Sequence, residues 1–282
     1  MNYNEPSIKK KREELSSPKK RRRTTASAVA FRVILFLICA ICVSGAGLAY
    51  GSFKGIIASA PKNVSLSPKY SSTIIYDDNN KAVQPLHDYS SNRIKVKSEE
   101  LPDNLKNAFI AIEDERFYEH NGIDIQGIGR AALIAVTTMH ATEGASPLTQ
   151  QVLKNNVFTD WTSENNFISS LKRKIQEQYL ALQLEKVTSK DTILEAYLNT
   201  INLGSNTLGV QAASLRYFNK DVSKITISES GVIAAITQNP SFYDPIINPK
   251  NNAKRRKKIL KNMRDAGHIT KAQYKEAIKD DV

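Results

Sequence analysis

The chain has 282 residues, of which 41% are hydrophobic and 24% charged, and this composition excludes a protein that is disordered throughout. Its formal net charge of +12 raises the question of a nucleic-acid partner, but more than half of the excess is confined to one end. Residues 1–32 carry ten Lys or Arg against three Glu, a net of +7, which leaves +5 for the remaining 250 residues. This basic tail has few apolar residues, so we predict that it is disordered and attracted to anionic surfaces.

An apolar segment follows the basic tail. Residues 33–50 are all apolar or small, and the weakly polar stretch to Ile57 can extend them. At about 1.5 Å per residue, roughly 18 to 25 helical residues match the hydrocarbon core of a bilayer. A buried core helix would show a polar face, and this segment has none. We therefore predict one transmembrane anchor over 33–57, and the positive-inside rule predicts a cytoplasmic tail and an outer domain.

A cleaved signal peptide is the alternative interpretation of the apolar segment. Its basic region would be unusually long, and the small residues at 58–60 are followed by Pro61, which disfavours cleavage. We therefore favour an uncleaved anchor, which makes the protein a single-pass type II membrane protein with its larger, carboxyl-terminal part extracellular.

The two cysteines of the chain, Cys39 and Cys42, have the CxxC spacing of redox and metal sites. Both lie inside the apolar segment, where small residues of a lipid-facing helix are the simpler interpretation. The domain beyond the anchor therefore has neither a disulfide nor a thiolate nucleophile.

Residues 58–100 are predicted to form a linker and a small β element. The stretch 58–73 is rich in Ser, Pro and Lys, as expected of a linker. β-Forming residues at 72–76 and 92–96 flank the turn-rich sequence 77–80, which predicts a small pair of strands.

From Leu101 the pattern becomes helical, and 101–282 is predicted to be the main domain together with the start of a connector. Apolar residues recur at helical spacing over 105–112 and over 193–201, where Thr188 with Asp191 is the expected cap. Further helices are predicted at 171–185, 228–236 and 253–264. The fold class is therefore mainly α, with a short β element at its start.

Three segments carry groups that suit chemistry, although each also has a plainer interpretation. The acidic stretch 113–122 ends a helix with a Gly and could be a solvated helix end. Residues 144–155 hold small, hydroxyl, amide and Lys side chains that suit a loop for a polyoxygenated substrate, or an ordinary capped helix start. Arg173 and Glu177 are i, i+4 neighbours, which by themselves indicate only a surface ion pair.

Taken together, these segments resemble the ordered motifs of the family 51 glycosyltransferases. The matches are EDxxFxxHxG at 113–122, GxSxxTQQ at 144–151 followed by Lys154-Asn155, RKxxExxxAxxLE at 173–185, KxxILExYLN at 190–199 with a later Gly209-Val210, and Arg255-Arg256 after Asn248-Pro249. The resemblance covers about residues 70–275. One departure is Pro147, where the family usually has Thr, and Pro supplies neither a hydroxyl nor a backbone donor.

The resemblance implies a lysozyme-like glycosyltransferase lobe with a smaller membrane-associated jaw. It further implies a peptidoglycan glycosyltransferase that polymerises lipid II into glycan strands with inversion, releases undecaprenyl pyrophosphate and is a target of moenomycin. The partners would be lipid II, the nascent glycan strand, membrane lipid and other cell-wall synthesis proteins, and no nucleic acid. A divalent cation, Mg²⁺ or Mn²⁺, would bind with the donor pyrophosphate.

Site residues are carried over position by position from the same resemblance. Glu113 matches the base that takes the proton of the acceptor's 4-hydroxyl, and Glu177 matches a second essential carboxylate. The substrate-binding positions are Lys154, Arg173 and Lys174 at the donor pyrophosphate, with Ser146, Gln151 and Asn155 as nearby polar contacts. These residue types fit the reaction, because a carboxylate activates an alcohol and cations stabilise a departing pyrophosphate.

Two alternatives remain besides the glycosyltransferase. A lysozyme-type hydrolase would need a carboxyl group with a raised pKa, and a cationic site opposes that. A non-catalytic, membrane-tethered interaction protein could use the basic run 254–258, although that run also fits a solvated or membrane-facing helix side. The stretch 263–277 resembles the connector of two-domain penicillin-binding proteins, but no SxxK, SxN and KTG set occurs in a suitable arrangement, so transpeptidase activity is not expected from these residues.

Overall fold

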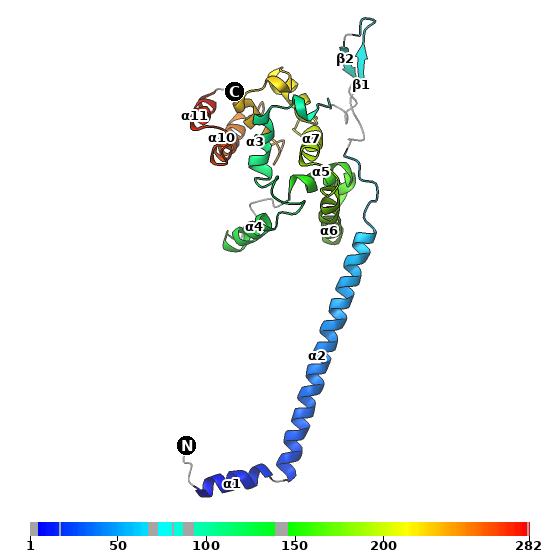
Figure 1. The fold of residues 1–282 in the computed structure, drawn as a ribbon, viewed down its shortest axis with the longest axis vertical. Coiled ribbons are helices and arrows are strands. Elements are labelled where there is room, and N and C mark those ends of the chain that lie inside the picture. The colour runs from blue at the N-terminus through cyan, green and yellow to red at the C-terminus, as the bar shows by residue number, and fades with distance from the viewer. Residues whose placement is uncertain are drawn as a thin grey trace. The chain divides into compact units, whose positions relative to one another are not determined.

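The computed structural model describes residues 5–16, 18–66, 73–80, 82–86, 93–138, 146–280 and 282. The chain forms two compact units, Met1–Ser59 and Ala60–Val282. The helices of the first unit are α1 (Glu5–Ser16) and α2 (Pro18–Ala58). The second unit contains β1 (Thr73–Tyr76), β2 (Ala82–Leu86), η1 (Ser98–Glu100), α3 (Asp103–Glu113), α4 (Ile125–Thr138), α5 (Leu148–Asn156), η2 (Thr159–Ser163), α6 (Phe167–Leu184), α7 (Lys190–Thr200), α8 (Val210–Phe218), η3 (Val222–Lys224), α9 (Ile227–Ala235), α10 (Pro249–Asp265) and α11 (Lys271–Lys279). The prediction of a mainly α fold is confirmed (Figure 1).

The first unit is helical over nearly all of its described length. The prediction of a disordered tail is wrong for Glu5–Ser16, which form α1. Its Lys, Arg and Glu residues are good helix formers, and Glu5 in the first turn suits the helix dipole. Within α2, Ala28–Ala58 is the one stretch among the described residues that is long and apolar enough to cross a membrane. Cys39 and Cys42 lie on it as free, exposed thiols.

The small β element is a hairpin at the start of the second unit. β1 and β2 pair antiparallel from Thr73 opposite Leu86 to Tyr76 opposite Ala82. The strand predicted at 72–76 is confirmed for Thr73–Tyr76. The strand predicted at 92–96 is wrong, because the partner of β1 is Ala82–Leu86, directly after the turn. Ser72 and Asn92 lie outside the described residues. Arg93 instead forms an isolated bridge with Leu208. A short turn closes a hairpin with less loss of chain entropy than a long loop does.

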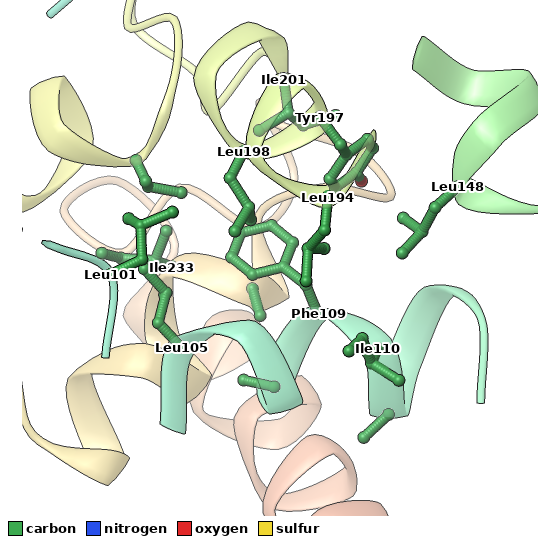
Figure 2. Packing of buried hydrophobic residues seen from close by; sticks show 14 of the residues in the cluster. Leu101, Leu105, Phe109, Ile110, Leu148, Leu194, Tyr197, Leu198, Ile201 and Ile233 are labelled. Carbon is green, nitrogen blue, oxygen red and sulfur yellow. The ribbon is translucent and has the colours of Figure 1, made fainter. Parts of the chain in front are cut away.

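Helices α3, α7, α9 and α10 surround the core of the second unit. α3 packs against α9 and α10, and α5 packs against both α6 and α7 (Figure 1). Phe109 of α3 is fully buried, and its ring meets Tyr197 of α7 edge to face with centroids 5.9 Å apart. Figure 2 shows Phe109 close to Leu194 and Leu198, which belong to α7, and it shows Leu148 of α5 facing this cluster. The apolar spacing predicted over 105–112 therefore faces the core.

Several predicted helices occur with altered ends. α6, α9 and α10 cover the three further helices predicted from the sequence. α7 is capped by Ser189, whose side chain accepts from Thr192 N–H, and the predicted Thr188 cap is wrong by one residue. The stretch 144–155 is largely helix α5 rather than a loop, which agrees with the alternative of a helix start; Gly144 and Ala145 lie outside the described residues. α4, α8 and α11 were not predicted.

Candidate active site

Glu113 is the last residue of α3, where Asp114 leaves the helical backbone region. Its Oε1 accepts a hydrogen bond from Thr237 Oγ1 at 2.5 Å, and its Oε2 accepts one from Gln151 Nε2 at 3.1 Å. A guanidinium nitrogen of Arg255 lies 3.8 Å from Oε1. Only 16% of the Glu113 side chain is exposed, so groups from α5, α10 and the turn after α9 fix the direction of this carboxylate.

A cleft of about 650 Å³ opens in front of Glu113. Of the residues predicted for the site, it is lined by Glu113, Ser146, Gln151, Lys154 and Lys174. These come from α3, α5, α6 and the segment that precedes α5, so the fold brings distant motifs to one cavity. Arg173, Glu177 and Asn155 are not among the described residues that line it.

Two of the predicted residues, Lys154 and Lys174, supply positive charge to the cleft, which Arg116, Arg130, Arg255 and Lys258 also line. Lys174 Nζ donates to Ser146 Oγ and to Glu177 Oε2, each at 2.8 Å, and the Lys174 side chain is 39% exposed. Burial lowers the pKa of Lys154; the carboxylate of Glu177 opposes this change, while the cations nearby, Lys174 and Arg173, add to it. An ammonium group that has been partly stripped of water binds an anion more strongly than a solvated one.

Glu177 is fully buried on α6, behind the lysines rather than in the cleft. One of its carboxylate oxygens accepts from Arg173 and the other from Lys174. Arg173 also donates from Nε to both oxygens of Glu164, at 2.9 and 3.0 Å. Burial alone would lower the pKa of Arg173, but the hydrogen bonds to Glu177 and Glu164 outweigh it and raise that pKa. Glu177 is therefore placed to orient the cations.

A second buried network fixes the start of α5 against the end of α3. Pro147 is the N-cap of α5 and offers no side-chain cap. The carboxylate of Asp114 replaces it, because Asp114 Oδ2 accepts Leu148 N–H at 2.9 Å. His120 Nε2 lies 3.0 Å from the same carboxylate, and its Nδ1 accepts Gly122 N–H at 3.1 Å, which requires the proton on Nε2. Asp114 thus sets the position of α5 and of its cleft residues.

Replacing Asp114 by Ala is expected to lower the free energy of unfolding by about 1–3 kcal/mol, because a buried N–H would lose its acceptor. Thermal unfolding of the full chain in detergent measures this change. Asp103→Ala is the matched control, since Asp103 lies on the first turn of α3 with its side chain 91% exposed. An equal effect of the two substitutions would contradict the capping role of Asp114.

Thr237, Gln238 and Arg255 are among the residues that line the cleft without having been predicted as site residues, although Arg255 belongs to the last motif match. The basic run 254–258 does not form a uniform solvated side, because Arg255 faces Glu113 and Arg256 is buried against Ser228. Helical spacing could have indicated that Arg255 points to the cleft, because it shares a helix face with the cleft residues Lys258 and Asn262.

The described residues do not by themselves provide a metal cage. Among them, no group of three or more His, Cys, Asp or Glu side chains is arranged to hold a metal ion. A Mg²⁺ ion commonly keeps several waters and binds through one or two carboxylates together with substrate phosphates. The described residues therefore fit a divalent cation that is shared with a phosphorylated substrate.

Comparison with known proteins assigns this arrangement to a family. Residues 79–264 match the Transglycosylase family. The chain is 42% identical over 263 residues to penicillin-binding protein 1A of Clostridium botulinum, covering 89% of this chain and 31% of that protein. It is 43% identical over 209 residues to penicillin-binding protein 1F of Bacillus subtilis, covering 74% of this chain and 28% of that protein. The crystal structure of penicillin-binding protein 1A from Haemophilus influenzae aligns with a TM-score of 0.40 and 24% identity, over 78% of this chain and 22% of that one. The chain thus spans less than a third of the length of these relatives.

Proposed function

Because the chain belongs to the transglycosylase family, we propose that its second unit is a peptidoglycan glycosyltransferase that polymerises lipid II into glycan strands. The donor is the growing chain on undecaprenyl pyrophosphate, and the acceptor is lipid II. The observation that carries the proposal is the shared cleft, in which the carboxylate of Glu113 and the ammonium groups of Lys154 and Lys174 face one cavity.

The proposed reaction is a single displacement with inversion. The 4-hydroxyl oxygen of the acceptor bonds to the anomeric carbon of the donor while the bond from that carbon to the pyrophosphate oxygen breaks. Glu113 takes the hydroxyl proton, a general-base contribution of about 10²- to 10⁴-fold. The electron pair of the broken bond leaves with the pyrophosphate, whose developing charge the cations of the cleft stabilise.

The hydrogen bonds of the two carboxylates favour this reaction over glycan hydrolysis. A lysozyme-type hydrolase needs a carboxylic acid that gives its proton to the glycosidic oxygen. Here both oxygens of Glu177 accept from cations, and those of Glu113 accept from Thr237 and Gln151. A purely non-catalytic binding protein would not require a carboxylate held on several sides at the wall of a cleft.

We propose that a divalent cation binds together with the donor. Because the described residues form no cage, Mg²⁺ or Mn²⁺ would be held mainly by the pyrophosphate, close to the cleft residues Lys154, Lys174 and Glu113. The cation would add to the neutralisation of the leaving group. The lysines of the chain provide part of that neutralisation themselves.

The apolar helix supports a place at the membrane, where the lipid-linked substrates are. Within α2, Phe36, Ile41 and Leu48 are each more than 70% exposed, as expected of a lipid-facing helix. The proposed type II orientation follows from the basic residues before this helix. In the second unit, α4 exposes Val136 by 77% and α6 exposes Phe167 by 78%. We assign these exposed apolar side chains to the membrane-associated jaw that the family resemblance implies.

The decisive test of this function uses the full chain in detergent with lipid II and Mg²⁺. Gel analysis should show glycan strands much longer than the disaccharide, and moenomycin should prevent their formation. Absence of polymer with a folded protein and an active reference enzyme would refute the proposed activity.

Replacing Arg173 by Ala is expected to weaken the use of pyrophosphate-linked donors by about 10-fold or more, on the scale of a lost hydrogen bond between charged groups. Without Arg173, Glu177 is left with Lys174 alone and draws that ammonium away from the cleft. Rates over a donor concentration series measure the effect. Lys172→Ala, an exposed neighbour on α6, is the control. Unchanged kinetics in Arg173→Ala would remove Arg173 from the donor site.

A further inference from the structure

A short segment between α5 and α6 contacts two of the site cations from outside the motifs. Trp161 of η2 is 37% exposed, and Lys154 Nζ lies over its ring, 4.4 Å from the centroid. The backbone holds this ring in place, because Trp161 N–H donates to Phe158 O at 3.1 Å and Glu164 N–H donates to Trp161 O at 3.4 Å. The segment 161–164 therefore contacts two site cations, because Trp161 contacts Lys154 and Glu164 pairs with Arg173.

Lys154 contacts the ring of Trp161 although two carboxylates are close enough to attract its ammonium group. Glu177 and Glu113 both attract the Lys154 ammonium. Pairing with either would neutralise the lysine and would occupy the proposed base or the residue that orients the other cations. An aromatic face attracts a cation but accepts no conventional hydrogen bond, so the three N–H groups of the ammonium stay available to an anion.

We propose that Trp161 is a positioning residue for donor binding. It holds the Lys154 ammonium at the edge of the cleft in the substrate-free protein and keeps it from pairing with the carboxylates. When the donor binds, the ammonium moves from the ring to a pyrophosphate oxygen. This inference rests on the proposed function, because it requires a pyrophosphate-linked substrate in the cleft.

The kinetic test compares two substitutions of similar bulk. Trp161→Leu is expected to raise the KM for the pyrophosphate-linked donor by roughly 3- to 10-fold, because Lys154 would then pair with a carboxylate that the donor has to displace, with a much smaller change in kcat. Trp161→Phe keeps an aromatic face and should restore most of the binding. A general loss of packing would instead affect both variants, lower kcat and lower the melting temperature. Equal KM values for Trp161→Leu and the unsubstituted protein would overturn the proposal.

The binding test uses the fact that Trp161 is the only tryptophan of the chain. Its fluorescence therefore reports on this ring alone. Titration of the full chain in detergent with undecaprenyl pyrophosphate should change the emission as Lys154 leaves the ring. In the substrate-free protein, Lys154→Met should also change the emission, whereas Lys172→Met, an exposed change on α6, should not.

An independent measurement with radiolabelled undecaprenyl pyrophosphate separates the possible failures. Binding without a change in Trp161 emission would overturn the positioning role and leave the proposed function intact. Absence of binding would refute the proposed donor site, and the positioning role with it. Binding with an emission change that Lys154→Met removes supports both.

Discussion

Replacing Glu113 by Gln is expected to reduce polymerisation of lipid II by about 10²- to 10⁴-fold, the range of a lost general base. The amide is nearly isosteric with the carboxylate but cannot take a proton from the acceptor hydroxyl. Its amide oxygen can still accept from Thr237, and the side-chain volume is nearly unchanged, so the fold has little reason to change. Gel analysis of the glycan product and thermal unfolding in detergent measure the two properties separately.

The matched control for this substitution is Glu115→Gln. Glu115 also lines the cleft, but its side chain is 57% exposed and pairs with Arg130, at 3.5 Å. An exposed ion pair contributes about 0–1 kcal/mol, so Glu115→Gln should leave both polymerisation and stability nearly unchanged. Wild-type polymerisation by a folded Glu113→Gln protein would eliminate Glu113 as the base.

Replacing Glu177 by Gln is expected to produce a different pattern, with lost stability as well as lost activity. Glu177 is fully buried and ion-paired to Arg173 and Lys174. Removing one partner of a buried pair costs about 3–5 kcal/mol. The lower end applies here, because Arg173 keeps Glu164 and Lys174 is partly exposed. At about 2–4 °C per kcal/mol, the melting temperature should fall by roughly 6–12 °C.

The kinetic effect of Glu177→Gln should be mainly on donor use, because the two cations lose the group that orients them. Glu164→Gln is the control, since it removes the other carboxylate of Arg173 at a site where the side chain is 17% exposed, and its effect should be smaller. A Glu177→Gln protein with an unchanged melting temperature and only a reduced kcat would show that Glu177 acts in the cleft as a reacting group.

The contrast between the two acids shows where the sequence motifs stop being informative. Both were assigned to the site from the same resemblance, and both lie at or near it. The structure separates them, with Glu113 at the cleft and Glu177 behind Lys174. Sequence spacing places Arg173 and Glu177 on one helix face, but it does not say whether that face meets solvent, substrate or the protein interior.

The errors of the sequence predictions have related causes. The strand predicted at 92–96 was wrong, because β-forming residues favour extended backbone without specifying a partner, and β1 pairs instead with the strand next to its turn. The cap of α7 was misplaced by one residue between two hydroxyl side chains, since either Thr188 or Ser189 has the required chemistry. Pro147 departs from the second motif and offers no side-chain cap, and Asp114, directly after α3, caps α5 in its place.

By itself, the sequence determined the apolar helix and the mainly α fold, and it proposed part of the set of residues that line the cleft, because hydrophobic period and ordered motifs are local properties of the chain. Only the tertiary structure decided which of these residues share the cleft, that Arg255 and Thr237 hold Glu113, and that Trp161 holds Lys154. The two contacts of Glu113 join segments far apart in the chain, and they depend on how the helices pack around Phe109 and Tyr197. No local pattern encodes that packing, since it results from burial of many apolar faces at once.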